Sequence, residues 1–167
     1  MRGTIASLAA LALAAMPGSA VAAAATAGVT ANAVALRPLS IVKVDDLDFG
    51  SAIAGAAAGT IVINPTTAAR STTGGVTPAS GTFNPAEFQT FGGPAIVLIQ
   101  LGPAPVLNRA GGGATMTVTG LTLDGPILRF LPAPGLLVLH VGGTLAVGAN
   151  QLDGSYSGTF SMTVTYF

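Results

Sequence analysis

The sequence predicts an all-β protein with two packed antiparallel sheets, a β-sandwich. Two observations carry this prediction. Apolar and polar residues alternate with a period of two in several segments, and turn residues recur about every 8 to 12 residues. A third agrees with them: after residue 25 no segment keeps the 3.6-residue period of an amphipathic helix. We therefore expect about eight to ten short strands in one immunoglobulin-like sandwich.

Residues 1–22 have the parts of a secretory signal peptide. Arg2 gives a short basic start, residues 5–15 are apolar, and residues 20–22 form a small-residue Ala-x-Ala cleavage pattern. The alternative, a buried N-terminal helix, would need a polar face that this segment lacks. We expect cleavage near residue 22, export of the protein, and a single β-sandwich domain over residues 23–167.

The first strands are expected on either side of Pro38. Residues 29–37 and 39–44 are rich in apolar and β-branched residues. Proline has no backbone N–H to donate to a ladder, so Pro38 should lie at a strand edge or a bend. Further along, Leu47 and Phe49 alternate with aspartates and are expected to point inward.

The middle strands are bounded by glycine, proline or asparagine. Residues 95–101 are almost wholly apolar, as in a strand that is covered on both faces. The alternation in residues 114–124 slips at Gly120, which indicates a bulge. A strand over residues 136–147 should be interrupted by two adjacent glycines. The remaining strands are short, and two of them are weak: residues 59–64, 75–77 and 87–91.

The closing strand, residues 154–167, has the clearest alternation. Its apolar positions, which we expect in the core, include Phe160, Met162 and Val164, and hydroxyl residues separate them. Phe167 is a terminal aromatic residue, as in many outer-membrane barrels, but it falls on the hydroxyl side of the strand. A small outer-membrane β-barrel is therefore the least favoured alternative to a secreted β-sandwich.

The composition excludes several classes of function. Six basic and six acidic residues leave a net charge of zero and no basic footprint for nucleic acid. Mean hydropathy is high, +0.70, yet after the N-terminal segment no apolar run reaches the roughly 18 residues of a membrane-spanning helix. The chain has no cysteine, which removes disulfides and zinc-thiolate sites. A surface so poor in charge suits a protein that packs against copies of itself.

No residue is predicted to be catalytic, cofactor-binding or metal-binding, and we do not expect an enzyme. His140 is the only histidine and lies in an apolar strand, so we expect a structural role. Asp45, Asp46 and Asp48 place three carboxylates close together. They would either help to hold calcium or form a solvated turn, but the ligand spacing and tight glycine turn of a calcium loop are missing.

Five short motifs follow one another along the chain: RPLSI at residues 37–41, LDFG at 47–50, GTIVI at 59–63, VGGTL at 141–145 and GSYSGTF at 154–160. This ordered set resembles a family of exported Gram-negative bacterial proteins described as a domain of unknown function, which is similar to the Mat/Ecp common-pilus fimbrillins. The resemblance spans about residues 29–167. It implies a secreted β-sandwich of the cell envelope and supplies no catalytic residues.

Two classes of function follow as expectations. As a structural or adhesive subunit, fimbrial-subunit-like, the protein would assemble with copies of itself or with other envelope subunits by β-strand addition at sheet edges. As a monomeric periplasmic or surface module, it would bind a ligand in loops such as residues 65–93. In both cases the protein is exported to the periplasm, the cell surface or the extracellular space.

Overall fold

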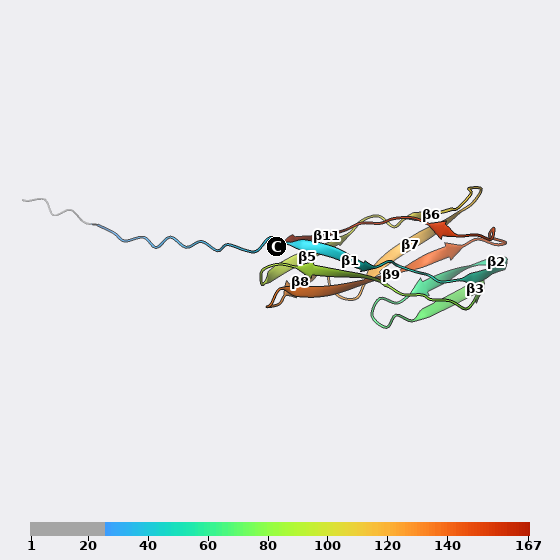
Figure 1. Ribbon diagram of the computed structural model, residues 1–167, viewed down its shortest axis with the longest axis horizontal. Helices are drawn as coiled ribbons and strands as arrows, with labels where there is room; N and C mark the ends of the chain where they lie inside the picture. The colour runs from blue at the N-terminus through green and yellow to red at the C-terminus, as the bar shows by residue number, and fades with distance from the viewer. Residues whose placement is uncertain (1–25) are drawn as a thin grey trace, which may run out of the picture. The chain divides into compact units, whose positions relative to one another are not determined.

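The computed structural model describes residues 26–167, so the predicted signal peptide lies outside the described residues. The chain divides into two units at Val34. In the first unit, the described residues 26–34 are exposed and form no strand. The second unit, Ala35–Phe167, carries every strand of the described chain (Figure 1).

Eleven strands and no helix make up the described secondary structure. Their bounds are β1 Ser40–Asp45, β2 Ala52–Ile63, β3 Arg70–Pro78, β4 Ala86–Phe91, β5 Ala95–Leu101, β6 Val106–Arg109, β7 Thr115–Leu123, β8 Leu128–Leu131, β9 Leu136–Val147, β10 Tyr156–Ser157 and β11 Met162–Tyr166. The prediction of an all-β chain is confirmed.

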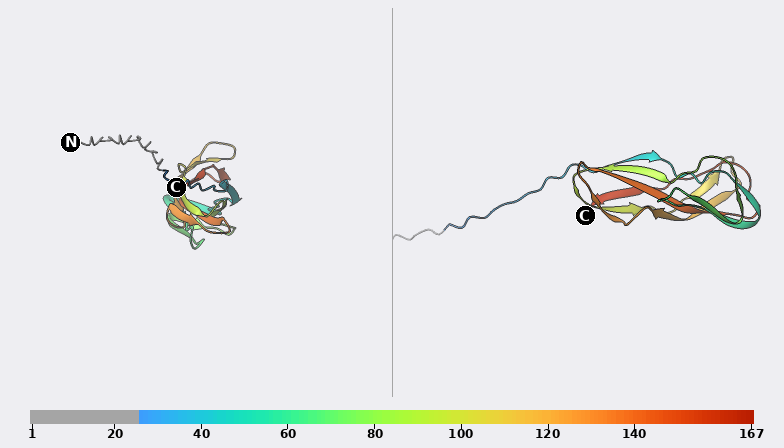
Figure 2. Two further views of the ribbon diagram at one scale, coloured as in Figure 1. Left: turned by 90° about the vertical axis from the view of Figure 1, so that its left-hand side faces the viewer. Right: turned by 90° about the horizontal axis from the view of Figure 1, so that it is seen from below.

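The strands form two antiparallel sheets. The large sheet has the order β1-β4-β9-β7-β6-β10, with β2 paired to β9 and β3 paired to β2. The small sheet has the order β11-β5-β8. Figure 2 shows the sheets from one end and from below. This arrangement confirms the predicted antiparallel β-sandwich.

The long strand β9 organises the large sheet. Its first half pairs with β4, its second half pairs with β2, and β7 lies along its other side. The predicted interruption at Gly142 and Gly143 is wrong, because β9 runs unbroken through both. A side chain on Gly142 would collide with the carbonyl oxygen of Ile63. The two glycines therefore allow neighbouring backbones to approach β9 closely rather than ending it.

Two local predictions meet different outcomes. The bulge at Gly120 is confirmed, because the register of β7 against β9 shifts between Val118 and Gly120. The prediction of a strand over residues 29–37 is wrong, because residues 26–39 form no strand and β1 begins at Ser40. A strand needs a partner for its backbone groups, and no described segment pairs with residues 29–37.

The closing segment forms two strands, not one. β10 pairs with β6 in the large sheet, whereas β11 pairs with β5 in the small sheet. Between them the backbone N–H of Gly102 donates to the carbonyl oxygen of Ser161 at 2.7 Å. The predicted alternation holds: Phe160, Met162 and Val164 are half-buried while the hydroxyl residues between them are exposed.

Strand β5 has one covered face. Val97 and Ile99 are at most 1% exposed, but Ile96 on the opposite face is 49% exposed. The prediction that both faces are covered is therefore wrong within this chain. On the outer face Ile96 lies opposite Phe130 of β8, which is also exposed.

The core has two parts. One comprises buried residues of the small sheet and of the first half of β9: Val97, Ile99, Leu131, Leu139 and Val141. The other is a cluster on the large sheet and the β1–β2 connection: Phe49, Ile61, Ile63, Val76, Val118, Leu145 and Val147. The paired part of the small sheet ends at Leu101 and Met162, and the second cluster lies beneath the segments beyond it.

Candidate binding groove

An open groove of about 1230 Å³ lies over the second core cluster. Its first rim is residues 45–54, which run from the end of β1 through the connection into the start of β2. Its second rim is residues 151–160, which include β10 and lead to β11. The floor consists of apolar side chains from five strands: Ile61, Ala86, Phe88, Leu107, Met116, Val118, Leu145 and Val147. At this end of the sandwich, loops border the core but do not cover all of it.

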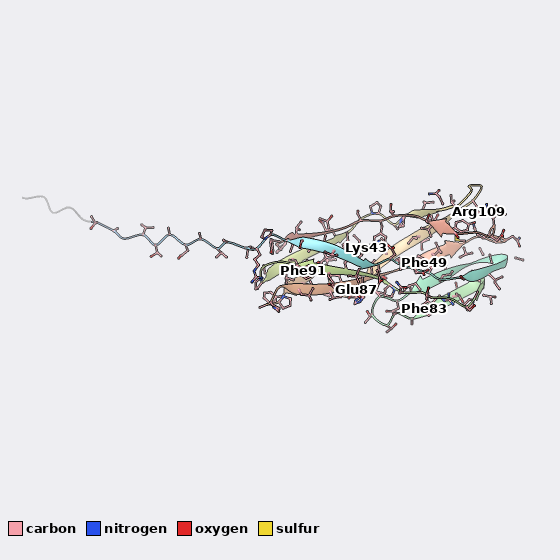
Figure 3. All side chains as sticks on the ribbon, viewed as in Figure 1. Lys43, Phe49, Phe83, Glu87, Phe91 and Arg109 are labelled. Carbon is pink, nitrogen blue, oxygen red and sulfur yellow. The ribbon has the colours of Figure 1, made fainter. Side chains whose placement is uncertain are left out.

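The first rim is held in place by its neighbours. Asp48 and Asn84 exchange two backbone hydrogen bonds of 2.9 and 3.1 Å, and the Asn84 side chain donates to the carbonyl oxygen of Asp46 at 2.8 Å. The Arg70 guanidinium lies 4.5 Å from the centre of the Phe83 ring. It also donates to the carbonyl oxygens of Phe49, Ser51 and Ala79. Figure 3 labels Lys43 and Phe49, two of the residues that line the groove.

The second rim is anchored to β6 and β7. The Gln151 amide donates to the carbonyl oxygen of Thr115 at 3.1 Å and to the Tyr156 hydroxyl at 2.8 Å. The Arg109 guanidinium donates to the carbonyl oxygen of Asp153 at 2.6 Å. Since both rims have fixed partners, the groove is already formed without any occupant.

An aromatic pair joins the second rim to the large sheet. The rings of Phe88 and Phe160 meet edge to face, with centroids 6.2 Å apart and planes at 72°. Both side chains line the groove and both are half-buried. The alternation predicts that Phe160 lies in the core. The half-buried ring confirms this prediction only in part.

Each rim is continuous with a strand that has a free edge. The first rim follows β1, which pairs only with β4, and the second rim precedes β11, which pairs only with β5. All six residues of β1 are exposed, including Ile41, Val42 and Val44. An edge strand with exposed apolar side chains on both faces can take another strand as partner.

The three aspartates of the first rim do not act together. Asp46 forms an exposed ion pair with Lys43 at 2.6 Å, and the Asp48 carboxylate accepts the backbone N–H of Gly50 at 2.7 Å. Asp45 lies opposite Glu87 in the ladder between β1 and β4. Within residues 26–167 no group of three or more His, Cys, Asp or Glu side chains is arranged to hold a metal ion.

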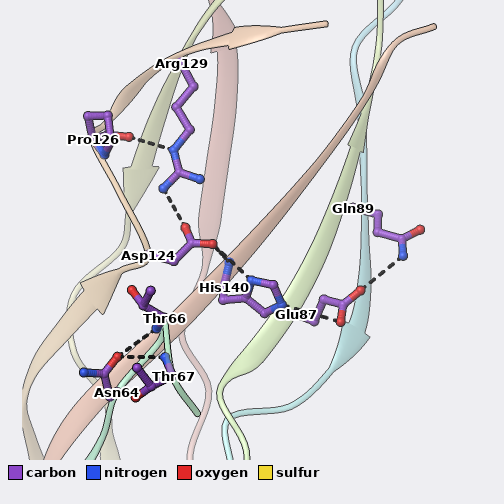
Figure 4. A network of polar contacts seen from close by, with 9 residues as sticks. All are labelled: Asn64, Thr66, Thr67, Glu87, Gln89, Asp124, Pro126, Arg129 and His140. Carbon is purple, nitrogen blue, oxygen red and sulfur yellow. Dashed lines mark hydrogen bonds and ion pairs between the residues drawn. The ribbon is translucent and has the colours of Figure 1, made fainter.

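A separate polar cluster surrounds His140 (Figure 4). The imidazole Nδ1 lies 3.0 Å from Asp124 Oδ2, and Nε2 lies 3.7 Å from Glu87 Oε2. The backbone N–H of His140 also donates to Asp124 Oδ2 at 3.1 Å, while Arg129 Nη2 donates to Asp124 Oδ1 at 2.6 Å. These contacts tie β4 and β9 to the connection between β7 and β8.

The Asp124 carboxylate is the electrostatic centre of this cluster. Burial raises its pKa, but hydrogen bonds from Arg129 and His140, together with the positive charge of Arg129, outweigh burial and leave the pKa below its usual value. The ionised carboxylate is therefore the form that the folded chain stabilises.

This cluster could not be predicted from the sequence, because strand pairing brings Glu87 opposite His140 and a turn brings Arg129 to Asp124. The only local signal is Asp124 itself, a charge at the end of an alternating segment. These contacts give a physical basis for the structural role predicted for His140.

The described part of the chain contains no helix with the length and apolar character needed to cross a membrane. A comparison with known families matches residues 39–166 to the family described as "Domain of unknown function (DUF4402)". No curated protein and no solved structure matches the chain. The predicted resemblance to a family of unknown function is confirmed at this level: the chain belongs to the DUF4402 family.

Proposed function

We propose that this protein is an exported, non-enzymatic structural or adhesive subunit of the cell envelope that assembles by β-strand addition. The observation that carries the proposal is the groove, whose floor leaves Phe88, Leu107 and Met116 partly exposed. Its rims are continuous with the free-edged strands β1 and β11. A strand added there would bury side chains on the floor and satisfy backbone groups at its sides.

The size and shape of the groove favour a peptide segment over a small molecule. Small-molecule sites are usually enclosed clefts of roughly 300–1,000 Å³ with a few convergent polar groups. This groove is larger, at about 1230 Å³, and its floor is formed by apolar side chains from five strands. Extended segments fit such sites because alternate side chains enter them while the main chain pairs with an edge.

The sequence adds three supporting features. Residues 1–22 resemble a secretory signal peptide, the chain has little charge, and its ordered motifs resemble those of proteins similar to the Mat/Ecp common-pilus fimbrillins. Together they favour an exported fimbrial-subunit-like protein of a Gram-negative envelope.

A monomeric ligand-binding module is the second candidate. The preformed rims favour it, because a site that needs no ordering on binding suits a small or medium-sized apolar ligand. The two candidates predict different assembly states: strand addition predicts multimers, and the ligand-binding module predicts a monomer.

The test is the assembly state of the exported protein. Surface protein sheared from cells and run on a gel without boiling should give a ladder that collapses to one subunit on boiling. Met116→Asp places a charge on the groove floor and should abolish the ladder. Thr117→Asp, its neighbour on the exposed outer face, is the matched control and should leave the ladder intact. A single monomer band from the unmodified chain would contradict the proposal and favour the ligand-binding candidate.

A further inference from the structure

We propose that the outer face of the small sheet, β11-β5-β8, packs against the same face of a second copy of this chain. The contact is separate from the groove, because it uses neither of the two rims. Five apolar side chains form the surface, which is called the outer patch below: Ile96, Leu98, Leu128, Phe130 and Phe167.

Strand register builds the outer patch from all three strands. Phe130 of β8 lies opposite Ile96 of β5. On the other side of Ile96, the backbone N–H of Phe167 donates to the Ile96 carbonyl oxygen at 3.0 Å, which extends the ladder of β11 by one residue. Two aromatic residues therefore flank one isoleucine in a row, with Phe167 79%, Phe130 60% and Ile96 49% exposed. Leu98 and Leu128 form a second pair beside this row.

The outer face of the large sheet has a different character. There, Thr60 and Thr73 lie opposite each other on β2 and β3 with their hydroxyls 2.8 Å apart, and β7 presents the exposed Thr117. Strand β5 instead is apolar at nearly every position, which is the pattern of a strand covered on both faces. The small sheet thus carries large apolar side chains where the large sheet carries hydroxyls.

The first reason to expect a second copy as the partner is the absence of charge. The polar residues of this face are Gln100, Thr163 and Thr165, which are uncharged. Arg129 of β8 lies on the inner side, where Asp124 binds it. Face-to-face packing of two copies therefore brings no like charges together, and the contact should be insensitive to salt.

The second reason is that the outer patch is complementary to itself, as a two-fold contact requires. Its first row reads aromatic, isoleucine, aromatic across the three strands. A two-fold axis beside Ile96 sets this residue against its own copy and sets rings against rings. Two sheets packed in this way lie about 10 Å apart with their strands roughly aligned.

The exposed area is that of a weak dimer. An aromatic side chain presents about 150–250 Å², so Phe130 and Phe167 together expose roughly 200–350 Å². With the three aliphatic residues, the outer patch reaches the roughly 300–600 Å² of the largest apolar patches on monomers, which are often functional. Two copies with their polar margins would bury about 1,000 Å², the lower limit of a specific interface. We therefore expect a dimer that dissociates on dilution.

Sedimentation of the mature protein at several concentrations tests the contact. Every chain carries Met116→Asp, so that multimers formed through the groove do not contribute, and the comparison is repeated in the natural background. The chain should show a monomer–dimer equilibrium that is equal at low and high salt. Ile96→Lys should raise the dissociation constant at least about tenfold. Val106→Lys is the matched control and should leave it unchanged, because Val106 is also β-branched and 48% exposed but lies on β6 of the large sheet.

A second variant guards against misfolding. Circular dichroism shows whether Ile96→Lys, on the central strand, keeps the melting temperature of its parent. Phe130→Thr, on the edge strand β8, should weaken the dimer in the same way and perturbs the fold less.

The following results would overturn the inference. One is a chain that stays monomeric at every concentration. Another is a dimer that Ile96→Lys and Phe130→Thr leave unchanged, or that Val106→Lys weakens equally. If the monomer instead floats with phosphatidylglycerol vesicles and Ile96→Lys abolishes this, the outer patch binds lipid and not a copy. None of these results decides the proposed function, which the boiling-sensitive ladder tests separately.

Discussion

The two ends of the sandwich differ in how completely they bury their apolar residues. At the closed end, where the small sheet is paired, residues such as Ile99, Leu131 and Leu139 are at most 1% exposed. At the open end, side chains of the groove such as Leu107 and Met116 remain half-buried between two loops. Beneath these half-buried side chains the open end has its own buried cluster, with Ile63 at 0% and Val118 at 3% exposure, so both ends contribute to the stability of one subunit. The open end differs in the partly exposed apolar side chains that lie above its core.

The largest expected effect is at the closed end. Leu139→Ala removes a side chain with 0% exposure from the central strand β9 and should cost about 2–5 kcal/mol of unfolding free energy. Against a typical domain stability of about 5–15 kcal/mol, this loss is severe. Met116→Ala at the open end should cost much less in the monomer, because its side chain is already partly in water. Urea titration of both variants measures the contrast, and equal losses would remove the distinction between the ends.

Phe160→Ala tests the boundary between the two ends. The ring is half-buried and contacts Phe88 edge to face, so its loss should fall below the roughly 3–5 kcal/mol of a fully buried phenylalanine. Thr163→Ala, on the exposed face of β11, should stay within about 0.5 kcal/mol. Melting temperatures should therefore rank Phe160→Ala clearly below Thr163→Ala. If the two variants melt together, Phe160 does not pack as the fold requires.

The smallest expected effect is the acid sensitivity of the closed end. The pKa of Asp124 is lowered in the folded chain, so its contribution to stability is fully present above the unfolded pKa of about 4 and is lost as pH falls through the folded value. The groups that face it are Arg129 and His140, with Glu87 beyond the imidazole. Asp124→Asn should therefore be less stable than the unmodified chain near pH 6, and the difference should shrink in strong acid. A constant difference in melting temperature from pH 6 to pH 2 would contradict this assignment.

The sequence predicted features that depend on local pattern. The alternation around Met162 and Val164 and the bulge at Gly120 need only the side-chain period, and both are present. Features that depend on distant partners were missed. Nothing local shows that β10 and β11 belong to different sheets, or that Glu87 lies opposite His140.

The errors of prediction have physical reasons as well. Gly142 resembles a strand breaker in sequence, but it is buried where the carbonyl oxygen of Ile63 leaves no room for a side chain. The pattern of residues 29–37 predicts a strand, yet within residues 26–167 no segment pairs with them, so their backbone groups have no ladder to join. Residues 95–101 are apolar at nearly every position, yet Ile96 on their outer face is 49% exposed.

The central claim is the proposal that strand addition from another subunit covers the open end, and hydrogen exchange tests it most directly. Exchange is followed by mass spectrometry on the full exported protein, in monomeric and multimeric fractions. In monomers, the amides of the groove rims, residues 45–54 and 151–160, should exchange faster than those of β9. In multimers, the rims should become protected and β9 should change little. Multimers in which the rims still exchange as fast as in the monomer would contradict the account.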